Sequence, residues 1–312
     1  SDVMWPWLIA AAAVLLALWV LYDVTQRQHA ILRNFPILGH FRYWFEAIGP
    51  ELRQYIVTSN DEERPFSRDE RRWVYASSKK ENNYFGFGTD NDLELAPNNL
   101  IIKHAVFPFP APWPGSPGYD HEYHIPCGKV LGAYRNRKKA FRPSSAVNIS
   151  AMSYGSLSAR AVEDMNRGAK LAGCLHNTGE GGISAYHQHG GELTWQIGTG
   201  YFGCRNDQGG FDEKRFLDAV ARHPVRAIEV KLGQGAKPGM GGILPAAKVT
   251  AEIAEIRGIP IGKDCHSPSS HPEFTNVDEM LDFIERLADA SGLPVGIKSP
   301  VGQIQFWKEL AD

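Results

Sequence analysis

The stretch EVKLGQGAKPGMGG, residues 229–242, says most about how this chain folds. An apolar, strand-like pattern runs directly into a turn dense in glycine, and this region carries Lys231, Gln234 and Lys237. Glycine lets the main chain approach a ligand closely, and lysines beside such a turn suit an anion. We therefore expect a β-strand that ends at an anion-binding loop.

Two upstream segments have the same character, namely AMSYGSLS at residues 151–158 and HNTGEGG at residues 176–182. From residue 147 onward, strand-like runs alternate with helical periodicity. Strands are expected at 147–152, 227–232, 259–265 and 294–298, residues 172–176 lead into the second glycine-rich turn, and helices are expected at 156–172, 245–257 and 275–291. Strands that alternate with helices predict βαβ units and a parallel sheet.

In this order and spacing, the three glycine-rich segments resemble the FMN-binding synthase domain of glutamate synthase, from about residue 145 to the C-terminus. The resemblance implies an α/β fold, a (β/α)8 TIM barrel of the FMN-binding type. A complete barrel takes about 250 residues, whereas residues 147–312 provide about five βα units of ~30 residues each. We therefore expect the N-terminal part of a longer barrel, without strands 7 and 8, where the phosphate usually binds.

The resemblance also assigns roles to individual residues, although it assigns no catalytic residue and we expect no metal site. It implies that FMN contacts Ser153, Tyr154, Gly155, Ser156, Thr178, Gly179, Glu180 and Lys298. It implies that the substrate contacts Lys231, Gln234, Lys237 and Arg257. On the residues alone, Arg257 is equally well a surface charge on a helix, and Glu180 is equally well a carboxylate that hydrogen-bonds to a tight turn.

Glutamate synthases reduce an imine, formed from 2-oxoglutarate and ammonia, with a hydride from FMN, and the resemblance implies this reductive amination here. It also implies two partners besides 2-oxoglutarate, an amine donor and an electron-donor protein or reductase subunit. The large enzymes of the family begin with a cysteine that releases ammonia from glutamine, whereas this chain begins Ser1-Asp2. The amine donor therefore stays open, and an alkylamine, which would give an N-alkylglutamate, is one alternative.

Two further functions also stay open. An FMN barrel could act on another 2-oxo or 2-hydroxy acid, because the fold alone does not fix the chemistry. A non-catalytic, membrane-tethered scaffold could keep the barrel frame.

The chain also departs from the family pattern. Met240 stands where the family has an acidic residue, and Asn276 stands where it often has a serine. The cysteine cluster that holds an iron–sulfur centre in the family is missing, so such a cluster is expected only in a C-terminal part that is not present in this chain.

The N-terminus predicts a membrane anchor. Residues 5–22 are uncharged and apolar, and their number is close to the ~20 residues that span a bilayer. Arg27, His29 and Arg33 follow this run, and the positive-inside rule then places the bulk of the chain in the cytoplasm. A cleaved signal peptide would need a basic region and a small-residue cleavage site, which are not evident. A buried core helix fits the terminal position less well.

We expect three regions, which are a transmembrane anchor with its juxtamembrane segment at 1–30, a helical and loop segment at 31–146, and the barrel part at 147–312. Within the middle region, residues 41–56 have helical spacing. The mixed charges of residues 61–82 are typical of a solvated helix, and the prolines of 107–118 favour an extended connector. His121 and His124 lack the spacing of a helical zinc site and are expected in a loop.

The composition excludes several classes of function. The formal net charge of −2 gives no basic field for nucleic acid. The four cysteines are scattered without a CxxC pair, which argues against a zinc site and against a local iron–sulfur site. We expect buried free thiols and a reducing compartment.

Overall fold

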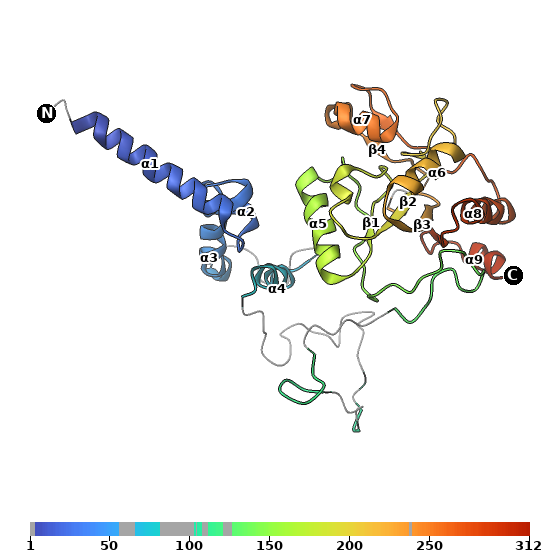
Figure 1. Ribbon diagram of the computed structural model, residues 1–312, viewed down its shortest axis with the longest axis horizontal. Coiled ribbons are helices and arrows are strands. Elements are labelled where there is room, and N and C mark those ends of the chain that lie inside the picture. The colour runs from blue at the N-terminus through green and yellow to red at the C-terminus, as the bar shows by residue number, and fades with distance from the viewer. Residues whose placement is uncertain are drawn as a thin grey trace. The chain divides into compact units, whose positions relative to one another are not determined.

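The computed structural model describes residues 4–55, 66–81, 103, 105–107, 112–120, 127–236 and 239–312. The chain divides into two compact units, Ser1–Phe109 and Pro110–Asp312 (Figure 1). His121 and His124 lie outside the described residues, as do residues 61–65 and 82 of the charged run and part of the proline-rich stretch.

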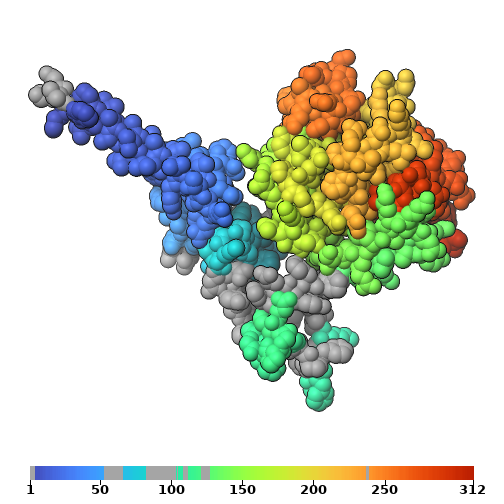
Figure 2. Space-filling model, viewed as in Figure 1, coloured from blue at the N-terminus to red at the C-terminus, as the bar shows by residue number. Residues whose placement is uncertain are grey.

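The first unit begins with α1, Met4–Thr25, a helix of 22 residues. At 1.5 Å per residue such a helix is about 33 Å long, which matches the hydrocarbon core of a bilayer. By length and composition α1 is able to cross a membrane. Its large apolar side chains are exposed, as for Trp7 at 75%, and Figure 2 shows the helix projecting from α2 and α3 over most of its length. These exposed side chains argue against a buried core helix.

A polar contact joins the end of α1 to the next two helices, α2 at Ala30–Asn34 and α3 at Gly39–Tyr55. Asp23 is fully buried in the last turns of α1. Its carboxylate accepts a hydrogen bond of 2.9 Å from the Ile37 amide and lies 2.9 Å from His40 Nε2. Trp19 Nε1 lies 3.1 Å from the same ring nitrogen. These contacts place the start of α3 beside the last turns of α1.

The charged run contains α4, Arg68–Lys79, which agrees with the helix expected there. A capping box begins the helix, because the Glu70 amide donates to Ser67 Oγ at 3.3 Å and the Ser67 amide donates to Glu70 Oε2 at 2.7 Å. Each partner satisfies a backbone group that the first turn of a helix leaves unpaired. No residue of α4 is buried, so the helix is solvated on most sides, as its mixed charges predict.

The second unit is a mixed α/β structure with a parallel sheet. Its described strands are β1 at His176–Asn177, β2 at Leu193–Ile197, β3 at Val225–Lys231 and β6 at Val295–Lys298, in the order β1-β2-β3-β6. All three pairings are parallel. Of the predicted strand at 147–152, only Ile149 pairs, in a parallel bridge to His176. The sheet therefore runs in sequence order from this bridge to β6.

Caps set the starts of two predicted helices. In α5, Ala159–Ala172, the side chain of Ser158 accepts from the Ala161 amide. In α8, Val277–Ser291, Asn276 Oδ1 accepts from the Glu279 amide at 2.9 Å. Both helices begin two or three residues later than expected, because a residue whose side chain caps the helix has an extended backbone itself.

Two assignments from the sequence were wrong. The run at 259–265 is not a strand of the parallel sheet, since only β5, Cys265–His266, is extended, and it pairs antiparallel with β4, Ile243–Leu244. Pro260 and Gly262, which has a φ of +73°, turn the chain before it. In the sheet, β3 therefore pairs directly with β6. The sequence analysis also missed β2, which lies between β1 and β3, and α6, Glu213–Arg222. The predicted helix at 245–257 divides into the short 3₁₀ turn Ala246–Lys248 and α7, Ala251–Arg257.

The main core lies between the sheet and helices α6 and α8. Trp195 of β2 is fully buried and stacks on Phe216 of α6, with ring centroids 5.6 Å apart. Val230 of β3 and Leu287 of α8 belong to the same cluster. All four cysteines are free, and Cys204 and Cys265 are buried as expected, whereas Cys127 and Cys174 are half-buried.

Replacing Phe216 with alanine is expected to lower the free energy of unfolding by about 3–5 kcal/mol, because the change leaves a cavity beside Trp195. Urea unfolding followed by circular dichroism measures this loss. Leu171→Ala is the matched control, since Leu171 is 85% exposed and should change the stability by less than about 0.5 kcal/mol. Equal effects of the two substitutions would show that the core does not lie at α6.

Candidate functional site

The carboxyl ends of the parallel strands surround a cavity of about 260 Å³. Lys231 ends β3, Lys298 ends β6, and Gly179 follows β1. The cavity is lined by Ala151, Met152, Ser153, Ser156, Leu157, Gly179, Glu180, Gln196, Lys231 and Lys298. The three glycine-rich regions of the sequence thus meet at one place, and six of the residues that the resemblance assigns to a site line it.

Lys231, Glu180 and Gln234 form a hydrogen-bonded triangle at this cavity. Lys231 Nζ lies 2.9 Å from Glu180 Oε1 and donates to Gln234 Oε1 at 2.9 Å. Gln234 Nε2 donates to the same Glu180 oxygen at 2.7 Å. Glu180 therefore neutralises Lys231 and accepts a hydrogen bond from the Gln234 side chain. Hydrogen bonding to a tight turn is thus not its whole role. The Lys231 and Glu180 side chains are 15% and 22% exposed, so a ligand in the cavity can reach both.

Lys298 is the other cation on the cavity. It is half-buried at the end of β6. Among the described residues, no hydrogen bond or ion pair joins the side-chain ammonium of Lys298, in contrast to that of Lys231. A half-buried cation without a carboxylate partner is the stronger attractor for an anion, because no internal charge has to be displaced. The positive potential of the cavity therefore comes mainly from the β6 side.

A second set of polar groups lies behind the cavity, and the sequence analysis missed it. Glu229 Oε1 accepts hydrogen bonds from Gln196 Nε2 and from Asn177 Nδ2. Asn177 Oδ1 in turn accepts from the Gly179 amide at 3.0 Å. These bonds fix the turn after β1 relative to β2 and β3. A signal was present for Glu229, since a carboxylate inside an apolar strand needs partners when it is buried.

Gly179 brings two of the loops into contact. Its φ is +67°, and a Cβ atom there would lie 2.6 Å from the Ser153 amide nitrogen. No other residue type fits so close to a main chain. Ser153 Oγ and Ser156 Oγ lie 2.9 Å apart in the facing turn. Gly179 was expected to make room for a flavin, and in this structure the main chain of the 151–158 segment already occupies that side.

Arg257 does not line the cavity. It is only 6% exposed, so the alternative of a surface charge on a helix was wrong. Its Nη2 donates to the Tyr154 carbonyl at 3.1 Å, and the guanidinium lies over the Phe202 ring at 5.1 Å. Arg257 Nη2 also lies 3.2 Å from the position that a Cβ of Gly155 would take. Arg257 therefore supports the turn formed by residues 153–156.

Tyr154 and Thr178 do not line the cavity either. Tyr154 Oη donates to Glu252 Oε2 at 2.5 Å in α7, and burial together with this hydrogen bond raises the pKa of Tyr154 above its usual value. Thr178 is buried, and its hydroxyl donates to the Gly179 carbonyl at 2.9 Å and accepts from the Gln196 amide. Lys237 lies outside the described residues.

Two buried histidines lie near β1, where the sequence analysis gave them no role. His176 and His187 are both fully buried, with ring centroids 5.3 Å apart. Burial lowers the pKa of His176 to about 4, and burial together with the neighbouring His176 lowers the pKa of His187 to about 3. Both rings are therefore neutral at pH 7. His187 Nδ1 accepts from the Ser184 amide at 3.1 Å. No group of three or more His, Cys, Asp or Glu residues suited to a metal ion exists among the described residues.

A sequence model described as "Conserved region in glutamate synthase" matches residues 129–305. The chain belongs to the glutamate synthase family. It is 39% identical over 333 residues to the "Glutamate synthase large subunit-like protein YerD" of Bacillus subtilis, covering 97% of this chain and 63% of that relative. This glutamate synthase family match extends beyond the conserved region into the N-terminal unit.

The NADPH-dependent relatives match a shorter part of the chain. The "Archaeal-type glutamate synthase (NADPH)" of Thermotoga maritima is 37% identical over 155 residues, which cover 49% of this chain and 28% of the relative. The "Archaeal glutamate synthase (NADPH)" of Methanocaldococcus jannaschii is 36% identical over 146 residues, or 46% and 26% of the two chains. The chain thus spans about two thirds or less of the length of these relatives.

The buried histidines predict a loss of stability in acid. Their pKa values in the folded chain lie below the ~6.5 of an unfolded histidine, so protons bind first to the unfolded state as the pH falls. The free energy of unfolding should therefore decrease from about pH 6.5 down to about pH 3, the lower of the two folded-state pKa values, and show no further contribution from these rings below that. His187→Gln should reduce this dependence in urea unfolding at pH 7.5, 6 and 5. His266→Gln, at an exposed histidine, should leave it unchanged. An unaltered pH dependence in His187→Gln would contradict the assignment.

Proposed function

We propose that this chain is the FMN-binding part of a membrane-anchored glutamate synthase-like oxidoreductase. The reaction would be the reductive amination of 2-oxoglutarate through an imine, with the amine donor and an electron-donor protein or reductase subunit as partners. The single observation that carries this proposal is the cavity at the strand ends, where Ser153, Gly179, Lys231 and Lys298 meet in a chain of this family.

The closed (β/α)8 barrel is part of the proposal. Its support is that neighbouring strands follow one another in sequence order and are all parallel. This is the arrangement that successive right-handed βα units give. In TIM barrels the active site lies at the carboxyl ends of the strands, which is where the cavity is found. On this proposal, residues 147–312 are barrel, residues 31–146 connect it, and residues 1–30 are the anchor.

The residues present fit part of an FMN. A cavity of about 260 Å³ is somewhat smaller than the 300–1,000 Å³ that is usual for ligand sites, which suits a flat ring better than a whole nucleotide. We place the ring beside Ser153–Ser156 and Gly179, and the phosphate outside this cavity. FMN would supply the hydride when bound. Lys298 would then hold a positive charge beside the ring, where it stabilises added negative charge.

The substrate would bind at the triangle of Lys231, Glu180 and Gln234, with Lys237 nearby in the sequence. Charge-assisted hydrogen bonds from lysine suit the carboxylates of a 2-oxo dicarboxylic acid. Arg257 has a different position from the others, because its Nη2 donates to the Tyr154 carbonyl. We propose that Arg257 positions the turn that faces the substrate, and that direct contact with a carboxylate would require this bond to open.

The membrane anchor is likewise a proposal. Its supports are the length and exposed apolar surface of α1 and the basic residues Arg27 and Arg33 that follow it. The charge bias places the bulk of the chain on the cytoplasmic side.

Lys231→Ala in the full-length protein tests the substrate assignment. Loss of a charge-assisted hydrogen bond costs about 1.5–3 kcal/mol, so affinity for 2-oxoglutarate should fall about 10- to 150-fold while the oxidised flavin spectrum stays intact. The measurement is 2-oxoglutarate-dependent reoxidation of reduced flavin, followed in the visible. Lys263→Ala, at an exposed lysine, is the matched control. If Lys231→Ala removes FMN and leaves 2-oxoglutarate binding unchanged, Lys231 belongs to the cofactor site. A full-length protein that stays colourless with added FMN would exclude the flavin.

The anchor is tested by charges in the middle of α1. Each arginine at the centre of a span costs about 2.5–3.5 kcal/mol, so the Leu15→Arg, Leu16→Arg double variant should leave carbonate-washed membranes and enter the soluble fraction. The unaltered chain and the control Leu171→Arg should stay in the membrane pellet. Recovery of the unaltered chain, uncleaved, in the soluble fraction would disprove the anchor.

A further inference from the structure

Helix α3 has one apolar face, and this face is exposed. Five apolar side chains follow one another at spacings of three and four residues and fall within an arc of about 100° around the helix. They are Phe41, Trp44, Phe45, Ile48 and Leu52. Ile48 is half-buried, whereas Phe41, Trp44 and Phe45 are 60%, 57% and 55% exposed. None of the five is buried within the first unit.

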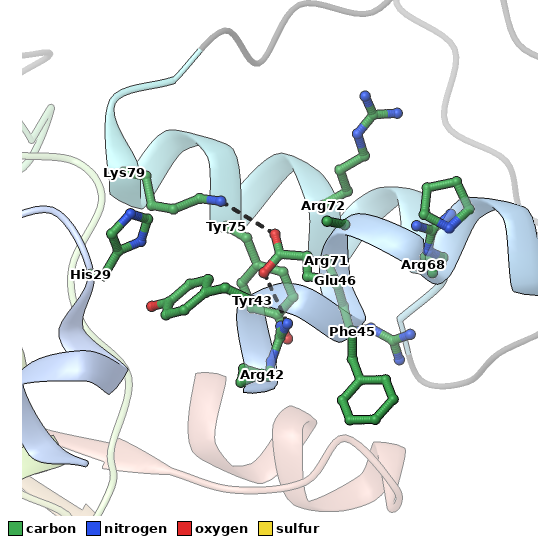
Figure 3. A pocket seen from close by; sticks show the side chains of 13 residues that line it. His29, Arg42, Tyr43, Phe45, Glu46, Arg68, Arg71, Arg72, Tyr75 and Lys79 are labelled. Carbon is green, nitrogen blue, oxygen red and sulfur yellow. Dashed lines mark hydrogen bonds and ion pairs between the residues drawn. The ribbon is translucent and has the colours of Figure 1, made fainter. Parts of the chain in front are cut away.

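The opposite face of α3 is polar, and it packs against α4. Arg42 Nη1 lies 2.9 Å from Glu46 Oε2, and Lys79 Nζ of α4 lies 3.3 Å from Glu46 Oε1 (Figure 3). The Lys79 ammonium also lies over the Tyr43 ring, 5.8 Å from its centroid. Figure 3 shows the Phe45 ring pointing away from Lys79. Helix α3 therefore turns its polar side toward its neighbour and its apolar side outward, the reverse of a surface helix in a soluble domain.

The exposed face begins at the end of the proposed span. Trp19 and Asp23 of α1 both contact His40, the second residue of α3, and so hold the start of α3 beside the last turns of α1. Phe35 and Leu38, in the connection between α2 and α3, are exposed as well. Exposed apolar side chains thus continue from α1 through this connection onto α3.

We propose that α3 lies in the interface of the bilayer, with its aromatic face at the boundary between headgroups and acyl chains. The inference rests on the proposed membrane anchor, because α1 brings the start of α3 to the membrane surface. Amphipathic helices enter such an interface with Trp, Phe and Leu, to a depth of about 5–10 Å. A bilayer suits this face better than a protein does, because the face continues from the span itself. The first unit then contacts the membrane twice, through α1 across it and through α3 along its surface.

Vesicle binding without the span tests this face by itself. The Leu15→Arg, Leu16→Arg variant of the full chain, in which the span is disabled, should still float with phosphatidylcholine vesicles in a density gradient. Adding Phe41→Ser and Trp44→Ser should lower its partition constant about tenfold for each aromatic side chain removed, because that apolar surface no longer leaves water. Circular dichroism should show unchanged helix content.

The matched control adds Trp73→Ser and Val74→Ser to the same background. These side chains of α4 are 52% and 55% exposed, close to the values for the aromatic residues of α3. The control should bind vesicles as the Leu15→Arg, Leu16→Arg variant does. An equal loss in the control would assign the binding to diffuse apolar surface and overturn the proposal. Vesicle binding that does not change on Phe41→Ser and Trp44→Ser would also overturn it.

Cysteine labelling shows what covers the face when the span is intact. Trp44→Cys and Trp73→Cys are introduced singly into the full chain in phosphatidylcholine nanodiscs, and peptide mass spectrometry separates their labelling by a membrane-impermeant maleimide from that of the four natural cysteines. Labelling should be lost for Trp44→Cys and retained for Trp73→Cys.

The same two substitutions in the lipid-free Leu15→Arg, Leu16→Arg variant separate the other possible occupants. Both sites should then be labelled. Shielding of Trp44→Cys without lipid would show that the second unit or another copy of the chain covers the face, and it would overturn the proposal. Equal labelling in nanodiscs, while carbonate washing leaves the chain in the membrane, would disprove the α3 face alone. Vesicle binding that depends on Phe41 and Trp44 supports this face even if the span is disproved.

Discussion

Parallel pairing of β1, β2, β3 and β6 is the constraint on which the candidate site depends. Because the strands run the same way, their carboxyl ends lie at one edge, and side chains from residues far apart in sequence meet there. Lys231 of β3 reaches Glu180, which follows β1, across the intervening strand β2. The strands are held in this arrangement by the apolar core. Side chains such as Trp195 of β2 and Val230 of β3 pack there against α6 and α8.

Hydrogen bonds to two carboxylates hold the side chains at this edge in place. Glu180 and Glu229 are both acceptors for several donors, one at the cavity and one behind it. A carboxylate with two or more donors is held in one orientation, whereas a partly satisfied one would cost free energy and move. The turn after β1 is fixed further by Gly179, whose missing side chain admits the main chain of Ser153. Polar contacts between loops therefore hold the site residues in position, and the apolar core holds the strands that carry these loops.

Local patterns in the sequence predicted several of these elements. The features that were missed depend on contacts between residues that are far apart in the sequence. Glycine-rich turns next to strand-like runs were visible because turn chemistry is local. The resemblance to the synthase domain that these turns carry then implied that Ser153, Gly179 and Lys231 belong to one site. The strand at Leu193–Ile197 was missed; its five residues lie between glycines at 190–191 and at 198, so no long strand-like run marks it. The burial of Arg257 was not visible either, because its partner Tyr154 is 103 residues away. The run at 259–265 was wrongly predicted as a strand because its apolar residues resemble one, although Pro260 and Gly262 are typical of a turn.

The two lysines at the cavity, Lys231 and Lys298, differ in how their charge is balanced, and this difference bears on how each meets an anion. Lys231 has its own carboxylate at 2.9 Å, so any anion that binds there has to displace Glu180 before it gains the full attraction of that lysine. Gln234 contacts both members of the pair and can keep one hydrogen bond to either while they separate. Lys298 needs no such exchange, so the first anion to enter the cavity is expected on the β6 side.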